Sequence, residues 1–562
     1  MAMKRFFATL ISAVALLIAS EASAQVDFGG AVLNNDMLGW GDMYNLTFTS
    51  HNYGTARSMA MGNAFTALGA DLVSATLNPA GIGMYTRADL SITPMLHLTK
   101  SDMKGSEPYY ANTSKGEQEF SDSTTSIAFA NFGTVYPIYR GSGAVTNINV
   151  GVVYNRIADF NHSYMGLSSD RAFTNSMANI FCTLSNIDNL STNSDGTMSY
   201  GNDPYYWGAV LAYKNGLTNK DSEGWYIDRI AETASIDQSL AVEVSGAIDE
   251  YDLSVGFNFV DKLYVGATLG LQSVEYRRDT FYGETYNYTT PPSGADMPYQ
   301  LDYMNYMQRT EFSGSGVNIK LGITARPVEW LRVGIAYHSP TLYSLNMHYD
   351  GEMWSRTYSV GSNPDDYDVD SQGYMYDEAY TGVWEDAGPY TWDFSSPSRL
   401  LLGGAVTLRQ RVILSVDYER SWYNSIRLQS SPIKGLSYTA MMKDVFKGGD
   451  TLRIGAEGYL LPFLALRAGY IWSGSTLRDT YKDAILTHPV LTSSSYVSCG
   501  VGLKFNENYY LDLAYQYNTA NYSSFMSFYA VDEADAAQSI ESSSFGLNTT
   551  RHIAVVTLGY RF

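Results

Sequence analysis

The chain has 562 residues, of which 36 are basic and 57 acidic, so its formal net charge is −21. Only 17% of the residues are charged, and this balance excludes a nucleic-acid-binding protein that works through a basic surface. The chain is rich in tyrosine (46) and glycine (49), and its slightly polar mean hydropathy excludes a bundle of membrane-spanning helices.

The first residues are typical of a secretory signal peptide. Lys4 and Arg5 precede an apolar run from residue 6 to 19, and a small-x-small cleavage site, Ala22-Ser23-Ala24, follows. We therefore predict that residues 1–24 are removed on export and that the mature chain begins near Gln25. A retained membrane helix is the alternative, but it would need about 20 apolar residues and no cleavage site.

Residues 25–87 are expected to form an N-terminal extension. Within it, residues 54–81 are mostly small residues and helix formers, which are too small to make a lipid-facing strand. A compact stretch of this kind packs well inside a barrel lumen, where close approach to the wall requires Gly and Ala. A plug in the lumen and a periplasmic linker are the two interpretations that the residues leave open.

After this extension, residues 88–562 are expected to form the main domain. Many segments of about ten residues alternate apolar and polar side chains, as the lipid-facing and lumen-facing positions of a membrane β-barrel do. In residues 252–259, for example, the odd positions are Leu, Val, Phe and Phe, and the even positions are Asp, Ser, Gly and Asn. Tight turns alternate with connections of tens of residues, which is typical of periplasmic turns and outer loops.

The sequence therefore predicts an all-β fold, an antiparallel transmembrane β-barrel of about fourteen strands with the small-residue segment as a hatch in its lumen. The expected strands are 88–99, 124–138, 146–164, 249–260, 263–285, 309–326, 331–348, 396–409, 411–428, 450–460, 464–476, 493–505, 509–523 and 549–562. The last of them alternates up to a terminal Phe562 and resembles the signal that the barrel-assembly machinery of bacterial outer membranes recognises. The terminal strand of a soluble sandwich is the alternative.

Chemistry-bearing motifs are missing. The two cysteines, Cys182 and Cys499, are not expected to pair, and the seven histidines are scattered without ligand spacing. The sequence has no CxxC, HExxH or GxSxG motif and no P-loop. We therefore predict no catalytic residues, no metal site and no cofactor, and we do not expect an enzyme.

Residues 54–94 resemble a known family. The residues that carry the resemblance are Ala56-Arg57, Gly62, Ala64, Ala67, Ala70-Asp71 and above all Asn78-Pro79-Ala80-Gly81. They are similar to the N-terminal hatch of the FadL/TodX family of outer-membrane transport proteins for long-chain fatty acids and other hydrophobic compounds. The form Gly-Thr-Ala-Arg-Ser-Met-Ala-Met-Gly, with Asn-Pro-Ala-Gly-Ile-Gly, looks most like members from Bacteroidetes-type bacteria.

The resemblance implies a mechanism. A hydrophobic ligand would be captured between the outer loops, pass to a deeper site and leave sideways through a gap in the barrel wall near the second and third strands. Asn78, Pro79, Ala80 and Gly81, with Arg57, would form the hatch element that gates this route. The outer loops, about 165–248 and 349–395, are much longer than in familiar fatty-acid transporters, so the resemblance does not imply which ligand is carried.

Strand parity places a set of charged side chains in the lumen. Arg332, Arg399, Arg453 and Arg467 are the candidate ligand-binding residues, since an arginine pairs well with a carboxylate headgroup. The other charges are Asp252, Lys320, Asp417, Glu457 and Asp512. Mixed charges inside a barrel also pair with each other or hold a plug, and this alternative stays open.

The outer loops carry two further patterns. Trp207, Trp225, Trp354, Trp384 and Trp392 would form a hydrophobic capture groove or would pack the long loops together. The acidic run from Asn363 to Asp370 lacks the spacing of an EF-hand, so a calcium site and a solvated acidic surface are the two interpretations.

These features favour a passive transporter of hydrophobic small molecules, of the long-chain fatty acid or aromatic hydrocarbon class, in the outer membrane of a Gram-negative bacterium. Its expected partners are the substrate, outer-membrane lipid and lipopolysaccharide, and the barrel-assembly machinery. We do not expect it to bind nucleic acid. One alternative is a surface adhesion or recognition barrel whose Tyr-rich loops bind a partner. Another is a haem-capture barrel, to which dispersed histidines such as His338 and His348 give little support.

Overall fold

The computed structural model describes fourteen stretches of two or more residues and two single positions. These are residues 32–33, 40–48, 52–105, 119–187, 190–192, 194, 198, 206–230, 234–288, 299–359, 369–375, 390–409, 411–431, 438–481, 485–530 and 540–562. The expected signal peptide (1–24), the acidic residues Asp365, Asp366 and Asp368, and Trp384 lie outside them.

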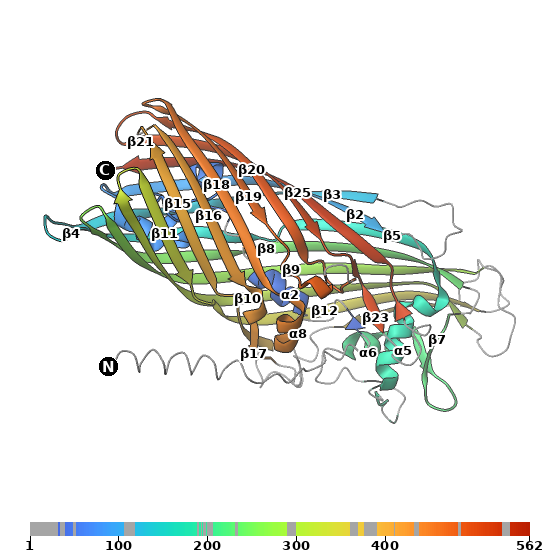
Figure 1. Cartoon of the computed structure of the whole chain (residues 1–562). Coiled ribbons are helices and arrows are strands. Elements are labelled where there is room, and N and C mark those ends of the chain that lie inside the picture. The colour runs from blue at the N-terminus through green and yellow to red at the C-terminus, as the bar shows by residue number, and fades with distance from the viewer. Residues whose placement is uncertain are drawn as a thin grey trace, which may run out of the picture.

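The described residues form a closed antiparallel β-barrel of fourteen strands, which confirms the predicted fold class (Figure 1). Each strand is hydrogen-bonded to the next, and the last pairs with the first. In order around the ring, the strands are β2 (Asp89–Gly105), β3 (Glu119–Arg140), β4 (Val145–Asp159), β8 (Ala234–Phe259), β9 (Leu263–Tyr288), β10 (Tyr299–Val328), β11 (Leu331–His338), β15 (Arg399–Leu408), β16 (Val412–Trp422), β18 (Gly448–Leu461), β19 (Leu464–Ser473), β20 (Leu491–Lys504), β21 (Tyr509–Tyr522) and β25 (Ser544–Arg561).

Shorter strands extend this ring or lie in the long connections. β5 continues β4 along β8, β12 continues β11 along β10, and β14 and β17 pair beyond β15 and β16. Their bounds, with those of the remaining strands, are β1 (Val32–Leu33), β5 (His162–Ala172), β6 (Thr218–Lys220), β7 (Tyr226–Asp228), β12 (Leu342–Ser359), β13 (Val369–Met375), β14 (Tyr390–Ser395), β17 (Arg427–Ser430), β22 (Phe525–Met526), β23 (Phe528–Ala530) and β24 (Ile540–Glu541). The expected single strands 146–164, 331–348 and 411–428 are therefore each broken in two.

The two ends of the barrel differ. One end, which we call the turn end, has tight connections such as residues 260–262, 329–330 and 462–463, together with the chain terminus at Phe562. The other, the loop end, carries the long connections and their helices (Figure 1). These helices are η2 (Phe173–Asn175), α5 (Met177–Ile187), α6 (Trp207–Lys214), η4 (Tyr423–Ser425), α8 (Tyr438–Val445) and η5 (Asp479–Tyr481). In an outer-membrane barrel the loop end faces the outside of the cell.

The wall is apolar outside and polar inside near the turn end, and this pattern reverses near the loop end. In β8, Leu253 is exposed on the outside while Asp252 is buried in the lumen. Closer to the loop end of the same strand, Glu243 is outside and Val242 and Val244 are buried inside. A membrane crossing needs only about 9–11 residues per strand, whereas β10 has 30. The barrel therefore extends beyond the bilayer into water.

This extension explains why several expected strand bounds are wrong. The segment 249–260 was expected where β8 covers Ala234–Phe259, and 309–326 where β10 covers Tyr299–Val328. The sequence pattern of a lipid-facing wall ends where the bilayer ends, but the hydrogen-bonded ladder continues. Outward apolar side chains such as Ile319, Leu321 and Ile323 mark the band that faces lipid, which identifies an outer-membrane barrel. Within the described ranges, no helix is both long and apolar enough to cross a membrane.

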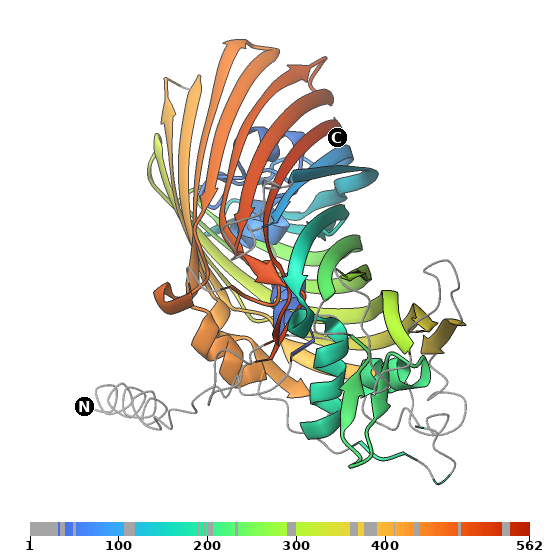
Figure 2. The same ribbon diagram turned by 90° about the vertical axis from the view of Figure 1, so that its right-hand side faces the viewer.

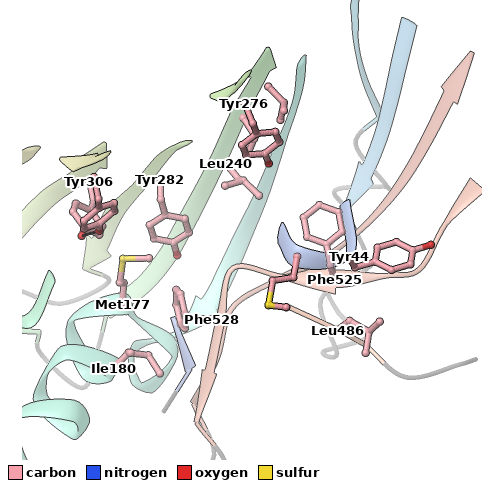
Figure 3. Packing of buried hydrophobic residues seen from close by; sticks show 14 of the residues in the cluster. Tyr44, Met177, Ile180, Leu240, Tyr276, Tyr282, Tyr306, Leu486, Phe525 and Phe528 are labelled. Carbon is pink, nitrogen blue, oxygen red and sulfur yellow. Dashed lines mark hydrogen bonds between the residues drawn. The ribbon is translucent and has the colours of Figure 1, made fainter. Parts of the chain in front are cut away.

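Two groups of buried residues fill the barrel. Residues 52–88, which we call the inner segment, lie between opposite walls of the barrel and include α3 (Ala56–Ala60), α4 (Ser74–Leu77) and η1 (Pro79–Met84) (Figure 2). At the loop end, α2 (Trp40–Thr47) and α5 pack with the wall into one hydrophobic core, in which Tyr44 lies near Phe525, and Met177 near Tyr282 (Figure 3).

Candidate functional site

Small side chains let the inner segment touch the wall. Ala56, Ala60, Ala64 and Ala67 are fully buried. The wall strands have glycines where the inner segment approaches them most closely. A Cβ atom at Gly334 would lie 2.1 Å from Thr66 O, and one at Gly469 would lie 2.2 Å from Gly62 N. The division of the chain at residue 87 and a gating role for this segment stay predictions.

The Asn78-Pro79-Ala80-Gly81 turn holds the inner segment together and fixes it to the wall. Asn78 caps η1, since its Oδ1 accepts a hydrogen bond from Ala80 N at 3.1 Å. Its Nδ2 donates to Thr66 O at 2.5 Å and to Thr324 Oγ1 of β10 at 3.1 Å. Pro79 starts the helix, where a missing N–H costs nothing. Gly81 O accepts from Ala70 N at 3.1 Å.

Arg57 fixes α3 to the opposite wall. Its guanidinium donates from Nε and Nη2 to the two carboxylate oxygens of Glu457, both at 3.0 Å. Glu457 is also 2.6 Å from Arg467, which in turn is 2.5 Å from Asp512. Nearby, Asp71 accepts a hydrogen bond from Thr55 at 2.8 Å, and burial raises the pKa of the Asp71 carboxyl, although the Arg57 charge acts to lower it.

The four predicted ligand-binding arginines lie inward, but they are engaged with the protein. Arg467 belongs to the Glu457 network, and Arg453 and Arg399 lie 2.7 and 3.4 Å from Glu419. Arg332 Nη1 donates to Leu68 O of the inner segment at 2.7 Å. The geometry supports the alternative that these charges pair with each other and hold the inner segment, and a role in ligand binding stays a prediction.

A chamber of about 140 Å³ lies between α2 and the inner segment. Most of its lining is aromatic or aliphatic, with a few charged side chains. Aromatic residues come from α2, the inner segment and five strands or their ends, for example Tyr44, Tyr53, Phe160, Tyr164, Tyr276, Tyr496 and Tyr522. The charged residues include Asp159, Arg278 and Arg551. An apolar chamber with a few convergent polar groups is the usual form of a small-molecule site.

Arg551 contributes a cationic side chain to the chamber lining. Its side chain lines the chamber with Tyr53, Tyr496 and Tyr522, and in the part of the chain that the structure describes it forms no ion pair or side-chain hydrogen bond. It lies on the inward face of β25, on the same side as Val555. Strand parity therefore contained the signal for it. Arg278, on the inward face of β9, could have been found in the same way.

The barrel ladder is interrupted beside this chamber. β3 pairs with β4 from Arg140 as far as Asn131, opposite Asn155, while β5 pairs with β8. Between residues 119–130 of β3 and β5 no backbone ladder is formed within the described ranges, and we call this stretch the seam. A side-chain hydrogen bond crosses it, between Thr124 Oγ1 and Ser163 Oγ at 3.0 Å.

Exposure on β3 agrees with an incomplete wall. Ile127 is 83% exposed on the outside, and the inward residues Thr124, Ser126 and Ala128 are only half-buried. On neighbouring β2 the inward residues, such as Thr99, are buried. Outward residues of the seam change from serine and threonine at 121–125 to Ile127 and Phe129, so its lower part lies at the depth of the apolar band.

The seam exists because the third wall strand bends. Asp159 and Phe160 lie at the junction of β4 and β5, where the pairing with β8 shifts and Phe160 N donates to Gly246 O at 3.0 Å. Gly246 has a φ of +110°, which residues with a side chain rarely adopt. Asp159 lines the chamber and lies 3.3 Å from His97 and 3.2 Å from Arg156. Beyond the bend, β5 pairs with β8 and forms no ladder with β3 in the described ranges.

Hydrogen bonds connect the lower end of the seam to the inner segment. Asn131 Nδ2 donates to Asn155 Oδ1 at 2.5 Å, and Asn155 Nδ2 donates to Thr76 Oγ1 of α4. Thr76 Oγ1 in turn donates to Asp252 at 2.8 Å, and Asp252 is 2.9 Å from Lys320. The last rung of the ladder and the inner segment are therefore one hydrogen-bonded unit.

The loop tryptophans divide between the two interpretations. Trp207 and Trp392 are fully buried in the loop-end core, where Trp207 packs near Tyr349 and Tyr390. Trp354 is half-buried, and Trp225 is 57% exposed at the β6–β7 hairpin. The buried pair packs the loops together, and a capture groove formed by the others stays a prediction.

The arrangement of the described histidines and acidic residues does not support the haem or metal hypotheses. His338 is buried, and its Nε2 lies 3.0 Å from Leu77 O, while His348 lies on an exposed strand surface 3.8 Å from Asp350. Over the described ranges, no group of three or more His, Cys, Asp or Glu side chains is arranged to hold a metal ion.

No protein family model and no curated protein matches the sequence. Solved structures with a similar chain course include a Pseudomonas aeruginosa FadL homologue, at 12% identity and a TM-score of 0.46, covering 92% of this chain and 98% of that one. The Pseudomonas putida toluene transporter TodX is 13% identical with a TM-score of 0.43, and the match covers 91% of this chain and 99% of that one. The Ralstonia pickettii toluene transporter TbuX is 14% identical with a TM-score of 0.42, and the match covers 92% of this chain and 100% of that one. These likenesses are distant and do not support the narrower likeness to Bacteroidetes-type members.

Proposed function

We propose that the protein is a passive outer-membrane transporter for hydrophobic small molecules. The observation that carries this proposal is the chamber beside the seam. A ligand that enters from the loop end would bind among the aromatic side chains and leave through the wall between β3 and β5. The route ends at the apolar band, where Ile127 and Phe129 face lipid.

The physical reason is the partition of an apolar solute. Such a molecule gains about 25 cal/mol for each Å² that it removes from water, so a lateral exit into lipid is favoured over a watery channel. The inner segment blocks the straight route to the turn end, because its residues are buried against both walls. The seam then becomes the exit.

The lining favours an amphipathic ligand within this class. Arg551 would orient a carboxylate, since a guanidinium binds that anion with two parallel hydrogen bonds. The apolar lining would hold the hydrocarbon part. A long-chain fatty acid uses both features, whereas an aromatic hydrocarbon uses only the second.

Filling the chamber tests the proposal. Ala520 is a buried residue of the chamber lining on β21, so Ala520→Phe would occupy part of the 140 Å³. We expect uptake of radiolabelled fatty acid to fall at least fivefold in cells that carry this variant. The matched control is Ala554→Phe, because Ala554 lies exposed on the outer face of β25 and its replacement leaves the chamber unchanged.

The assay compares cells with the gene, without it and with each variant, and includes a panel of aromatic hydrocarbons. Gene-dependent uptake that Ala520→Phe abolishes and Ala554→Phe spares is the expected result. If no panel compound enters in a gene-dependent way while the barrel is correctly inserted, the transporter proposal is wrong and the adhesion interpretation leads.

A further inference from the structure

The loop-end side of the chamber is closed by α2. Tyr44, Asn45 and Phe48 line the chamber from this side. Tyr44 stacks on Phe446 with ring centroids 4.6 Å apart and shares a hydrogen bond with Thr476 at 2.9 Å. Both partners belong to the long connections. A ligand that comes from outside therefore meets α2 before it meets the chamber.

One charged contact ties α2 to the wall of the chamber. Asp42, which is fully buried, accepts a hydrogen bond from Arg278 Nη1 on β9. Its second oxygen lies 3.6 Å from His488 Nε2, and its first lies 3.4 Å from Tyr276 OH. Arg278 is only 8% exposed in its side chain and lines the chamber itself.

The contact uses only part of the guanidinium. Arg278 Nη2 is buried and has no hydrogen-bond partner in the described structure. An arginine bound to a carboxylate usually donates from two nitrogens to two oxygens. Asp42 thus neutralises the charge of Arg278 but leaves the Nη2 donor without an acceptor. A carboxylate that bound both nitrogens could replace it.

We propose that α2 is a displaceable lid and that Asp42 occupies Arg278, the second of the two arginines that line the chamber, until the headgroup of an anionic amphiphile replaces it. This inference rests on the proposed transport function and adds to it a competition between the protein's own carboxylate and that of the ligand. An acid would open the lid by taking Arg278. A neutral molecule of the same length has no group that competes with Asp42.

The competition is tested by binding to the purified full-length protein. Two probes are used, a long-chain carboxylic acid with a fluorophore at its tail and the alcohol of the same length with the same fluorophore. Asp42→Asn removes the competing charge, and we expect the acid to bind about tenfold more tightly and the alcohol to change less than twofold. Adding Arg278→Gln should remove the gain. Asp444→Asn, at an acidic position that does not line the chamber, is the matched control.

A second measurement leaves Asp42 in place. In a chain with Cys182 and Cys499 changed to serine, Asn45→Cys puts a thiol on α2 at the chamber. We expect the acid to speed alkylation of this thiol at least fivefold and the alcohol to have no effect.

The outcomes separate the two proposals. The competition is wrong if Asp42→Asn changes the binding of acid and alcohol equally, or if it leaves acid binding unchanged and the acid does not speed alkylation of Asn45→Cys. The transport proposal is unaffected by either result. If neither probe binds the wild-type protein or any variant, the proposed function fails as well.

Discussion

At the scale of single residues, the lumen charges show both what strand parity can predict and where it stops. Parity placed Glu457, Arg453 and Arg467 inside, and they are buried there. It did not give their partners, because Arg57 meets Glu457 from the inner segment, which is 400 positions away in the sequence. Register between distant strands sets such contacts, and the alternation of one strand carries no information about it.

Glu457 offers the sharpest test at this scale. Glu457→Gln removes the charge that holds Arg57 and Arg467, both largely buried. Breaking a buried ion pair by removing one partner costs about 3 kcal/mol or more, since the other charge is left uncompensated. We expect the free energy of unfolding in lipid vesicles to fall by that amount in a denaturant titration.

Asp479→Asn is the control for this measurement. Asp479 is 92% exposed and pairs with Lys447 at 3.2 Å, and an exposed pair contributes little. A loss for Glu457→Gln no greater than for this control would show that the Arg57–Glu457–Arg467 network does not hold the inner segment.

At the scale of elements, the sequence was most informative for the fourteen wall strands. Each expected segment overlaps one strand of the ring, because lipid outside and packed polar groups inside impose a period of two. The bend between β4 and β5 was not foreseen. The sequence around Asp159 and Phe160 has no glycine or proline to signal a turn, so it predicts one continuous strand. The bulge there appears only in the pairing with β8.

Gly246 is the residue on which the bend depends. Its φ of +110° and the position of a Cβ atom 2.2 Å from Glu275 O leave no space for a side chain. We expect Gly246→Ala to lower the free energy of unfolding by about 2 kcal/mol, through strain at a left-handed residue and overpacking. The measurement is the same denaturant titration.

Gly404 provides the comparison for Gly246. It lies in β15, and a Cβ atom there would have nothing within 4 Å. Gly404→Ala should change the free energy of unfolding by no more than about 0.5 kcal/mol. Equal effects at the two positions would mean that the bend tolerates a side chain at Gly246.

At the scale of the whole molecule, three features meet in one place: a lid of residues from α2, an apolar chamber and a seam in the wall. The inner segment connects to the seam through Thr76, Asn155 and Asn131. Fold class and the inner segment's composition could be read from the sequence. The chamber and the seam could not, because they arise where eight strands, α2 and the inner segment meet, and no single segment carries that arrangement.

The central claim is that ligand leaves through the seam, and a removable bond across it tests this most directly. In a chain with both native cysteines changed to serine, Thr124→Cys with Ser163→Cys would join β3 to β5, where the two hydroxyl oxygens are 3.0 Å apart. Ser495→Cys with Thr519→Cys, 3.1 Å apart on the already paired β20 and β21, is the matched control.

The measurement is fatty-acid uptake by cells with each bond oxidised and then reduced, with the extent of bond formation determined by mass spectrometry. We predict that the bond across the seam lowers uptake at least fivefold, that reduction restores it, and that the control bond changes nothing. Unchanged uptake with the seam fully bonded would contradict the account and would require an exit elsewhere in the barrel.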